Sequence, residues 1–151
     1  MLRRLEPIGA LVDHEIDLSR AEINQMVSRL FMSSIYGGSM QATFPPIGKE
    51  KLRKHGMNDF MYLHLKYHPF APQNPGRCGL WFSTEDEKPE TWAGLKRVFT
   101  RDREVSMWQY MGQYDVQRAA SLTLEEWLDH KPAVSVLCTL RDFEFDFYCP
   151  R

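Results

Sequence analysis

The sequence lacks the features that mark secreted, disulfide-bonded and membrane-spanning proteins. It has three cysteines, Cys78, Cys138 and Cys149, and none of them forms a Cys-x-x-Cys pair. An odd and scattered set favours reduced thiols over a disulfide framework. No apolar run approaches the ~20 residues that a membrane-spanning helix needs, and Glu6 and Pro7 interrupt the N-terminal stretch before the apolar core of a signal peptide can form. We therefore expect an intracellular protein, in the nucleus or the cytoplasm, without a membrane partner.

An excess of charge of one sign is also absent. Lysine and arginine number 19 and aspartate and glutamate 20, which gives a formal net charge of −1, so the molecule as a whole does not attract nucleic acid or anionic membranes. Of the residues, 43% are hydrophobic and 13% aromatic, a content that supports a folded core and argues against disorder. The 151 residues contain no internal repeat, and they fit a single domain over 1–151.

Familiar catalytic and metal-binding motifs are missing as well. The chain has no G-x-G-x-x-G, no GKS or GKT phosphate loop, no H-E-x-x-H and no G-x-S-x-G. His64 and His68 have the spacing of two metal ligands on a helix, but they fall at a strand end and in a His-Pro loop, and Cys78 does not complete a zinc pattern. The acidic run Glu85–Glu87 is typical of a solvated loop. We expect no catalytic residues, no metal and no cofactor. This favours a binding module and leaves an enzyme with an unrecognised site as the third hypothesis.

One amphipathic helix is predicted near the N-terminus, in LSRAEINQMVSRLFMSSIYGG. Ser19 and Glu22 form a capping box, and the two closing glycines offer a stop. Apolar or small side chains recur at helical spacing in one stripe, which consists of Ile23, Met26, Val27, Leu30, Phe31 and Ser34. We expect a flexible segment over 1–16 and a helix over 17–36. Its stripe packs on the protein's own sheet, with a groove for a protein partner as the alternative.

Alternation of apolar and polar residues predicts several short strands. They lie within 57–70, 80–83, 95–101, 107–116 and 143–147. A basic helical turn, Lys49–Gly56, precedes the first strand, and a short helix with a capping box at Thr123 and Glu126 follows the fourth. This order favours an α+β fold with a small, mainly antiparallel sheet or a partly closed barrel. Residues 37–132 form its core, and 133–151 add a C-terminal strand.

The stretch MWQYMGQYDV, Met107–Val116, is the most distinctive in the chain. As the returning strand of a hairpin, it sends Trp108, Tyr110 and Tyr114 to one face, and Gly112 on that face marks a bulge, a bend or a close approach by a ligand. Such a face packs on a core in most sheets. Aromatic rings along a cleft can also stack on an unpaired base, so both roles stay open.

Two clusters of positive charge stand out in this neutral chain. One lies in GKEKLRKHG and the other surrounds the predicted hairpin. The candidate phosphate contacts are Lys49, Lys51, Arg53, Lys54, Arg97 and Arg101. With the three aromatic residues as a stacking surface, they make a non-enzymatic nucleic-acid-binding module the leading hypothesis, and a modified base is one candidate ligand. The second hypothesis is a protein-interaction domain that uses the N-terminal helix or the apolar C-terminal tail.

Four motifs resemble an uncharacterised domain family of basidiomycete fungi. They are TFPPI, the pattern P-x-x-P-G-x-x-G-L-W-F at Pro72–Phe82, WQYMGQYDV and SLTLEEW, and together they cover roughly Gly37–Trp127. The resemblance implies a fungal origin and one autonomous domain, often embedded in longer proteins. It implies no reaction, because the family has no assigned function. After Pro132 the sequence departs from the family pattern. A weaker likeness, in V-F-x-R followed by W-x-Y-x-G-x-Y, is similar in style to PUA-like and SRA-like barrels, which bind modified or flipped bases.

Overall fold

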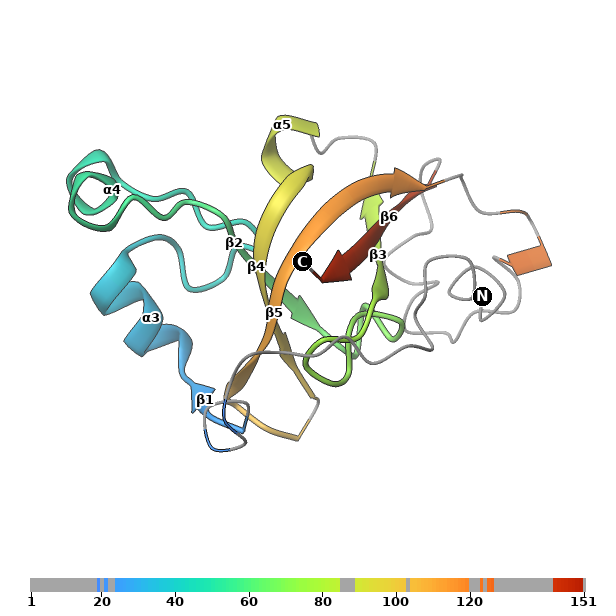
Figure 1. Ribbon diagram of the computed structural model, residues 1–151, viewed down its shortest axis with the longest axis horizontal. Helices are drawn as coiled ribbons and strands as arrows, with labels where there is room; N and C mark the ends of the chain where they lie inside the picture. The colour runs from blue at the N-terminus through green and yellow to red at the C-terminus, as the bar shows by residue number, and fades with distance from the viewer. Residues whose placement is uncertain are drawn as a thin grey trace.

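The computed structural model describes residues 24–84, 89–102, 104–119 and 143–150, together with the single positions 19, 21, 123, 125 and 126. Its elements are β1 (Met26–Val27), α3 (Arg29–Tyr36), α4 (Lys49–His55), β2 (Phe60–His64), β3 (Gly79–Thr84), α5 (Pro89–Trp92), β4 (Gly94–Arg101), β5 (Trp108–Ala119) and β6 (Phe143–Pro150). The sheet curls into a half-barrel, with α3 and α4 at one end of the molecule (Figure 1). The predicted α+β class is confirmed.

Six strands of the described residues form one sheet in the order β2-β4-β5-β6-β3, with β1 beside the start of β5. Every pairing is antiparallel except that of β2 with β4. β5 is the central strand, because β4 runs along one of its edges while β1 and β6 pair with the start and the end of the other. The predicted hairpin and the mainly antiparallel sheet are therefore confirmed.

The N-terminal helix is shorter than the sequence predicts. α3 begins at Arg29, and its N-cap is Ser28, whose hydroxyl accepts a hydrogen bond from the Phe31 amide at 3.0 Å. The predicted continuous helix over 17–36 is wrong at Met26 and Val27, because these residues pair with β5, while the described Ala21 further upstream is helical. Backbone amides committed to a sheet ladder cannot continue a helix.

The predicted packing of the helical stripe holds for Val27, which packs against the sheet, and is wrong for Leu30 and Phe31. Leu30 and Phe31 are 68% and 51% exposed, whereas Met32 is buried against the sheet. The cap at Ser28 turns α3 so that the face with Met32 and Tyr36 meets the strands. Ile23, the first member of the stripe, lies outside the described residues.

A β-bulge in β5 changes which face of the sheet the alternate side chains occupy. Val98 pairs with Gly112 and Phe99 with Tyr110, so Met111 is an extra residue in β5. Gly112 has a φ of 128°, a conformation that L side chains rarely adopt. The bulge is one of the outcomes expected for this glycine, but the prediction that Trp108, Tyr110 and Tyr114 share one face is wrong. One inserted residue shifts the period-two alternation, so Tyr114, which follows the bulge, lies on the opposite face of the sheet from Trp108 and Tyr110.

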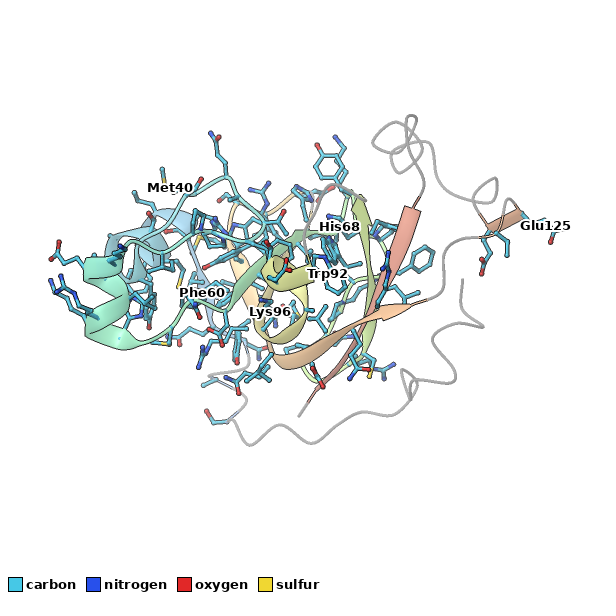
Figure 2. The ribbon with its side chains drawn as sticks, turned by 90° about the horizontal axis from the view of Figure 1, so that it is seen from above. Met40, Phe60, His68, Trp92, Lys96 and Glu125 are labelled. Atoms are coloured by element: carbon cyan, nitrogen blue, oxygen red, sulfur yellow. The ribbon has the colours of Figure 1, made fainter. Side chains whose placement is uncertain are left out.

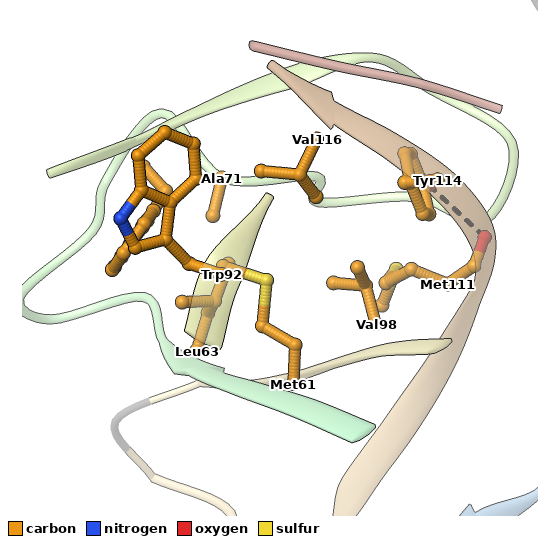
Figure 3. Packing of buried hydrophobic residues seen from close by; sticks show 9 residues of the cluster. Met61, Leu63, Ala71, Trp92, Val98, Met111, Tyr114 and Val116 are labelled. Carbon is orange, nitrogen blue, oxygen red and sulfur yellow. Dashed lines mark hydrogen bonds between the residues drawn. The ribbon is translucent and has the colours of Figure 1, made fainter. Parts of the chain in front are cut away.

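The sheet buries apolar side chains on both faces. We call one set the inner cluster: Met61, Leu63, Ala71, Trp81, Trp92, Val98, Met111, Tyr114 and Val116 (Figure 3). The outer cluster lies against α3 and consists of Met32, Phe60, Tyr62, Phe99 and Trp108. Because both faces are covered here, four consecutive residues of β2 are buried.

The other predicted elements are confirmed with changed limits. β2 ends at His64, where a turn begins, so the strand predicted within 57–70 is shorter. The capping box is formed, since the Glu126 amide donates to the Thr123 hydroxyl at 3.2 Å and the Thr123 amide to the Glu126 carboxylate at 3.0 Å. The rest of that helix lies outside the described residues, and α5 has no counterpart among the predictions.

Candidate anion-binding pocket

A pocket of about 440 Å³ opens on the side of the outer cluster, where β2, β4 and β5 approach the segment after α3. It is lined by Arg29, Met40, Gln41, Thr43, Tyr62, His64, Tyr67, His68, Arg101, Ser106 and Trp108. Two of these side chains are arginines, and none of the lining residues within the described part of the chain is Asp or Glu. Figure 2 labels Met40 and His68, which lie on the same side of the ribbon. The lining therefore carries positive charge without a carboxylate to balance it.

Arg29 is held in place by a ring and by two carbonyl groups. Its guanidinium carbon lies 3.5 Å from the centroid of the Tyr62 ring, and its Nη2 donates to the carbonyl oxygens of Ser39 and Ala42, the latter at 3.0 Å. Burial lowers the pKa of Arg29, an effect opposed by the charge of Tyr62, but an arginine stays protonated in proteins. Burial also raises the pKa of Tyr62 to about 12, so its phenol stays neutral. Arg29 therefore offers a fixed positive charge.

Arg101 lies over the second ring of the pocket. Its guanidinium carbon is 5.1 Å from the centroid of Trp108, and that of Arg29 is 5.8 Å from the same centroid. The Nε of Arg101 is buried and has no hydrogen-bond partner in the structure. No ion pair joins this guanidinium to a carboxylate within the described residues. Two cations thus converge on Trp108, and one of them has its hydrogen-bonding capacity unused.

His68 adds a neutral polar group to the pocket wall. Burial lowers its pKa to about 3, and the nearby charge of His64 acts in the same direction. Its ring packs against Phe82 and Trp81, with centroid distances of 6.3 Å and 6.4 Å. Its Nδ1 is buried and has no partner within the described part of the chain. At neutral pH this imidazole is uncharged, so His68 adds no positive charge to that of the two arginines.

The structure separates most of the predicted phosphate contacts from the pocket. Only Arg101 lines it. Lys51 donates to the carbonyl oxygens of Ser34 and Ile35 at 2.7 Å and 3.0 Å and so caps the C-terminal end of α3. A lysine at that end also opposes the negative pole of the helix dipole. Its charge is therefore committed to the fold.

The remaining predicted cations lie on α4 and β4. Lys54 forms an exposed pair with Glu50 at 2.9 Å, and Arg97 forms an ion pair with Asp59. Lys49 and Arg53 are exposed on α4. This helix projects at the end of the molecule away from β6 (Figures 1 and 2), and its residues do not line the pocket.

The predicted stacking residues are also divided. Trp108 lines the pocket but is only 8% exposed, and Arg101 lies over its ring. Tyr110 packs on Phe99 in the outer cluster. Tyr114 is fully buried in the inner cluster. The bulge therefore places only one of the three rings at the pocket.

Sequence reasoning missed several lining residues. Tyr67 is the most exposed of the aromatic rings there, at 37%. His64 is the last residue of β2, and Tyr67 and His68 lie in the turn that follows it. Their position at the end of a strand was a signal that the sequence offered. No sequence pattern indicated Arg29 as a site residue. It lies between members of the predicted apolar stripe, and its role depends on the contact with Tyr62.

Within the described residues, no group of three or more His, Cys, Asp or Glu side chains is placed to hold a metal ion. No helix in that part of the chain has the length and the apolar character needed to cross a bilayer.

A family model described as a domain of unknown function, DUF6697, matches residues 26–138. The chain belongs to this family. The DUF6697 match runs from β1 to beyond β5 and includes every residue that lines the pocket, so the pocket is part of the family domain. No curated protein and no solved structure matches the chain. The uncharacterised family indicated by the four motifs is confirmed to that extent.

Proposed function

We propose that this DUF6697 domain is a binding module for single-stranded nucleic acid and that the pocket between Arg29 and Arg101 receives a phosphate group. The observation that carries the proposal is the convergence of two guanidinium groups on Trp108 in a lining without Asp or Glu among the described residues. Arginine presents a planar fork of donors that matches the oxygens of a phosphate. Gln41, Thr43 and Ser106 add neutral donors at the same pocket.

The aromatic part of the proposal differs from the one expected from the sequence. Since Trp108 is almost buried beneath Arg101, we assign it the task of orienting that guanidinium. A base of the ligand would stack on Tyr67, whose ring is the most exposed in the lining, or on the guanidinium plane itself, as arginine does in RNA complexes. A modified base stays a candidate ligand.

The salt dependence of binding separates this site from the six-cation surface predicted from the sequence. For single strands, the slope of log K against log salt is about −0.7 for each phosphate neutralised. One phosphate held between Arg29 and Arg101 gives a slope of about −0.7, whereas six cations on six separate phosphates give about −4. Fluorescence anisotropy with labelled, mixed-sequence DNA and RNA single strands, over a series of salt concentrations, measures this slope.

Two variants locate the bound strand on the surface. We expect Arg101→Gln to weaken binding roughly tenfold or more, since a hydrogen bond to a charged group contributes about 1.5–3 kcal/mol. Arg53→Gln removes the same charge from α4 and should change affinity less than about twofold. Circular dichroism confirms that both variants are folded. Absence of binding at low salt would remove the proposal, and a larger effect of Arg53→Gln would move the site to α4.

A second candidate function is protein binding at α3. Leu30, Phe31 and Ile35 are 68%, 51% and 46% exposed on this eight-residue helix, and the cationic helix α4 lies beside it. This combination fits an acidic amphipathic segment of a partner protein. Titration with a synthetic peptide of that type tests it: Phe31→Ser should abolish binding, and equal affinity of the variant would exclude this surface. The side chains of the C-terminal tail, the other surface considered, lie outside the described part of the structure.

We further propose two finer features that the motifs imply, a basidiomycete origin and a likeness to PUA-like barrels. The scattered cysteines support a location in the nucleus or the cytoplasm. The curled sheet is compatible with such a barrel but is not specific to it.

A further inference from the structure

We infer that the pocket selects a terminal phosphate, a phosphomonoester at the end of a strand or on a free nucleotide, over the internal phosphodiesters of a chain. The inference rests on the proposed function, because it specifies which phosphate that site takes. It follows from the charge of the lining, its hydrogen-bond donors and the surroundings of the pocket.

The charge of the lining favours a dianion. Arg29 and Arg101 supply two positive charges, and no Asp or Glu among the lining residues that the structure describes offsets them. His68 and Tyr62 are neutral at physiological pH. A phosphomonoester carries about −1.5 to −2 at neutral pH, whereas an internal phosphodiester carries a single charge. Only the monoester balances both guanidinium groups in a partly desolvated site.

The donors of the lining match a group with three terminal oxygens. Arg101 is unpaired within the described residues and lies on Trp108, which leaves its terminal nitrogens for a bidentate contact. Arg29 is already bonded to two carbonyl groups, so it contributes mainly its charge. Thr43 and Ser106 can donate to the remaining oxygens. A phosphodiester has only two such oxygens and would leave donors without acceptors.

The surroundings of the pocket do not continue the site along a strand. The volume of about 440 Å³ is in the range of pockets that enclose one small ligand. Beyond it, Lys51 caps α3, Lys54 pairs with Glu50 and Arg97 pairs with Asp59. Among the described residues, a strand that passed through would find one exposed cation, Lys66 beside Tyr67, because the exposed Lys49 and Arg53 lie on α4 and do not line the pocket. One nucleotide at a strand end finds its phosphate and its ring partner, Tyr67, in a single site.

The test compares ligands that differ only in the terminal phosphate. Anisotropy measures the affinity for one oligonucleotide sequence with a 5′-phosphate, with a 3′-phosphate and with hydroxyl groups at both ends. Calorimetry compares a nucleoside 5′-monophosphate with its methyl diester, which distinguishes a free nucleotide from a strand end. We expect at least one monoester to bind about tenfold more tightly than its matched hydroxyl or diester ligand, because charge-assisted bidentate contacts are the strong ones.

Variants of Arg101 separate this inference from the proposed function. Arg101→Gln should reduce the preference for the monoester to within about twofold, and Arg101→Lys should retain part of it. Arg118→Gln, an equal loss of charge at an exposed side chain, should leave it intact. Equal binding of phosphorylated and hydroxyl-ended strands, both weakened by Arg101→Gln, would overturn the inference while the proposed function stands. Absence of binding of any strand or nucleotide at low salt would contradict both the inference and the proposed function.

Discussion

The hydroxyl of Tyr114 lies 3.0 Å from the carbonyl oxygen of Met111, the extra residue of the β5 bulge (Figure 3). The same hydroxyl is 3.0 Å from the carbonyl oxygen of Arg77, and the Gly76 amide donates to Met111 at 2.9 Å. The bulge is therefore tied to the loop that precedes β3 inside the inner cluster. A residue that the sequence suggested for ligand stacking instead joins two parts of the fold.

Removal of the Tyr114 hydroxyl should destabilise the protein. Tyr114→Phe leaves buried carbonyl groups with one donor fewer, and we expect a loss of about 1–2 kcal/mol in the free energy of unfolding, measured by urea denaturation. Tyr110→Phe is the matched control. That ring lies on the opposite face, and a change of less than about 0.5 kcal/mol is expected. Equal effects of the two substitutions would contradict the role given to Tyr114.

Gly112 should resist substitution because of its backbone conformation rather than its surroundings. Its φ is 128°, and an added Cβ would meet only Tyr114 Cε2, at an ordinary 3.5 Å. We expect Gly112→Ala to cost about 1–3 kcal/mol, whereas Gln113→Ala, at the next position of the strand, should cost less than about 0.5 kcal/mol. Thermal unfolding of the two variants measures the difference. A Gly112→Ala variant as stable as the parent would show that the bulge does not need a glycine.

The position of the helix cap can be tested directly. Ser28→Ala removes the acceptor for the Phe31 amide and should cost about 1 kcal/mol. Gln25→Ala, at an exposed position just before β1, should change stability by less than about 0.5 kcal/mol. Hydrogen exchange at the Phe31 amide reports the local effect. An unchanged exchange rate of the Phe31 amide in Ser28→Ala would contradict this cap.

The free energy of unfolding should decrease in weak acid because of the buried His68. Its pKa is about 3 in the folded protein against an ordinary value of 6.5. Between these two pKa values the unfolded chain binds a proton that the folded chain does not. The contribution of His68 to the free energy of unfolding is therefore complete above about pH 6.5 and declines by about 1.4 kcal/mol for each pH unit below it. Urea unfolding across this range measures the slope. His68→Phe should flatten it and His55→Gln should not, and parallel slopes for the parent and His68→Phe would refute the assignment.

The sequence predicted much of the fold because its signals were local. Alternation located β2, β3, β4 and β5, and glycine marked the bulge. Contacts between residues far apart in the chain could not be predicted from these local signals. Capping chemistry favoured Ser19, but the pairing of Met26 and Val27 with β5 decided where the helix begins, and no local pattern carries that contact.

The site was predicted less completely than the fold. Charge runs identified Arg101, but they also selected Lys51 and Arg97, whose partners Ser34 and Asp59 lie far along the chain. Arg29 was missed because its role depends on its contact with Tyr62, which lies far along the chain. Whether a cation is available to a ligand depends on tertiary partners, and composition does not report them.

The place of β6 in the sheet has a consequence for how the protein is made. β3 has its sheet neighbour in β6, the strand nearest the end of the described chain. During synthesis from the N-terminus, the hairpin of β4 and β5 can form early, because its partners are close in sequence. β3, with Leu80 and Trp81, is translated before β4 and β5 but cannot pair until β6 has left the ribosome. A chain truncated before β6 would therefore expose an apolar strand edge and should aggregate rather than fold.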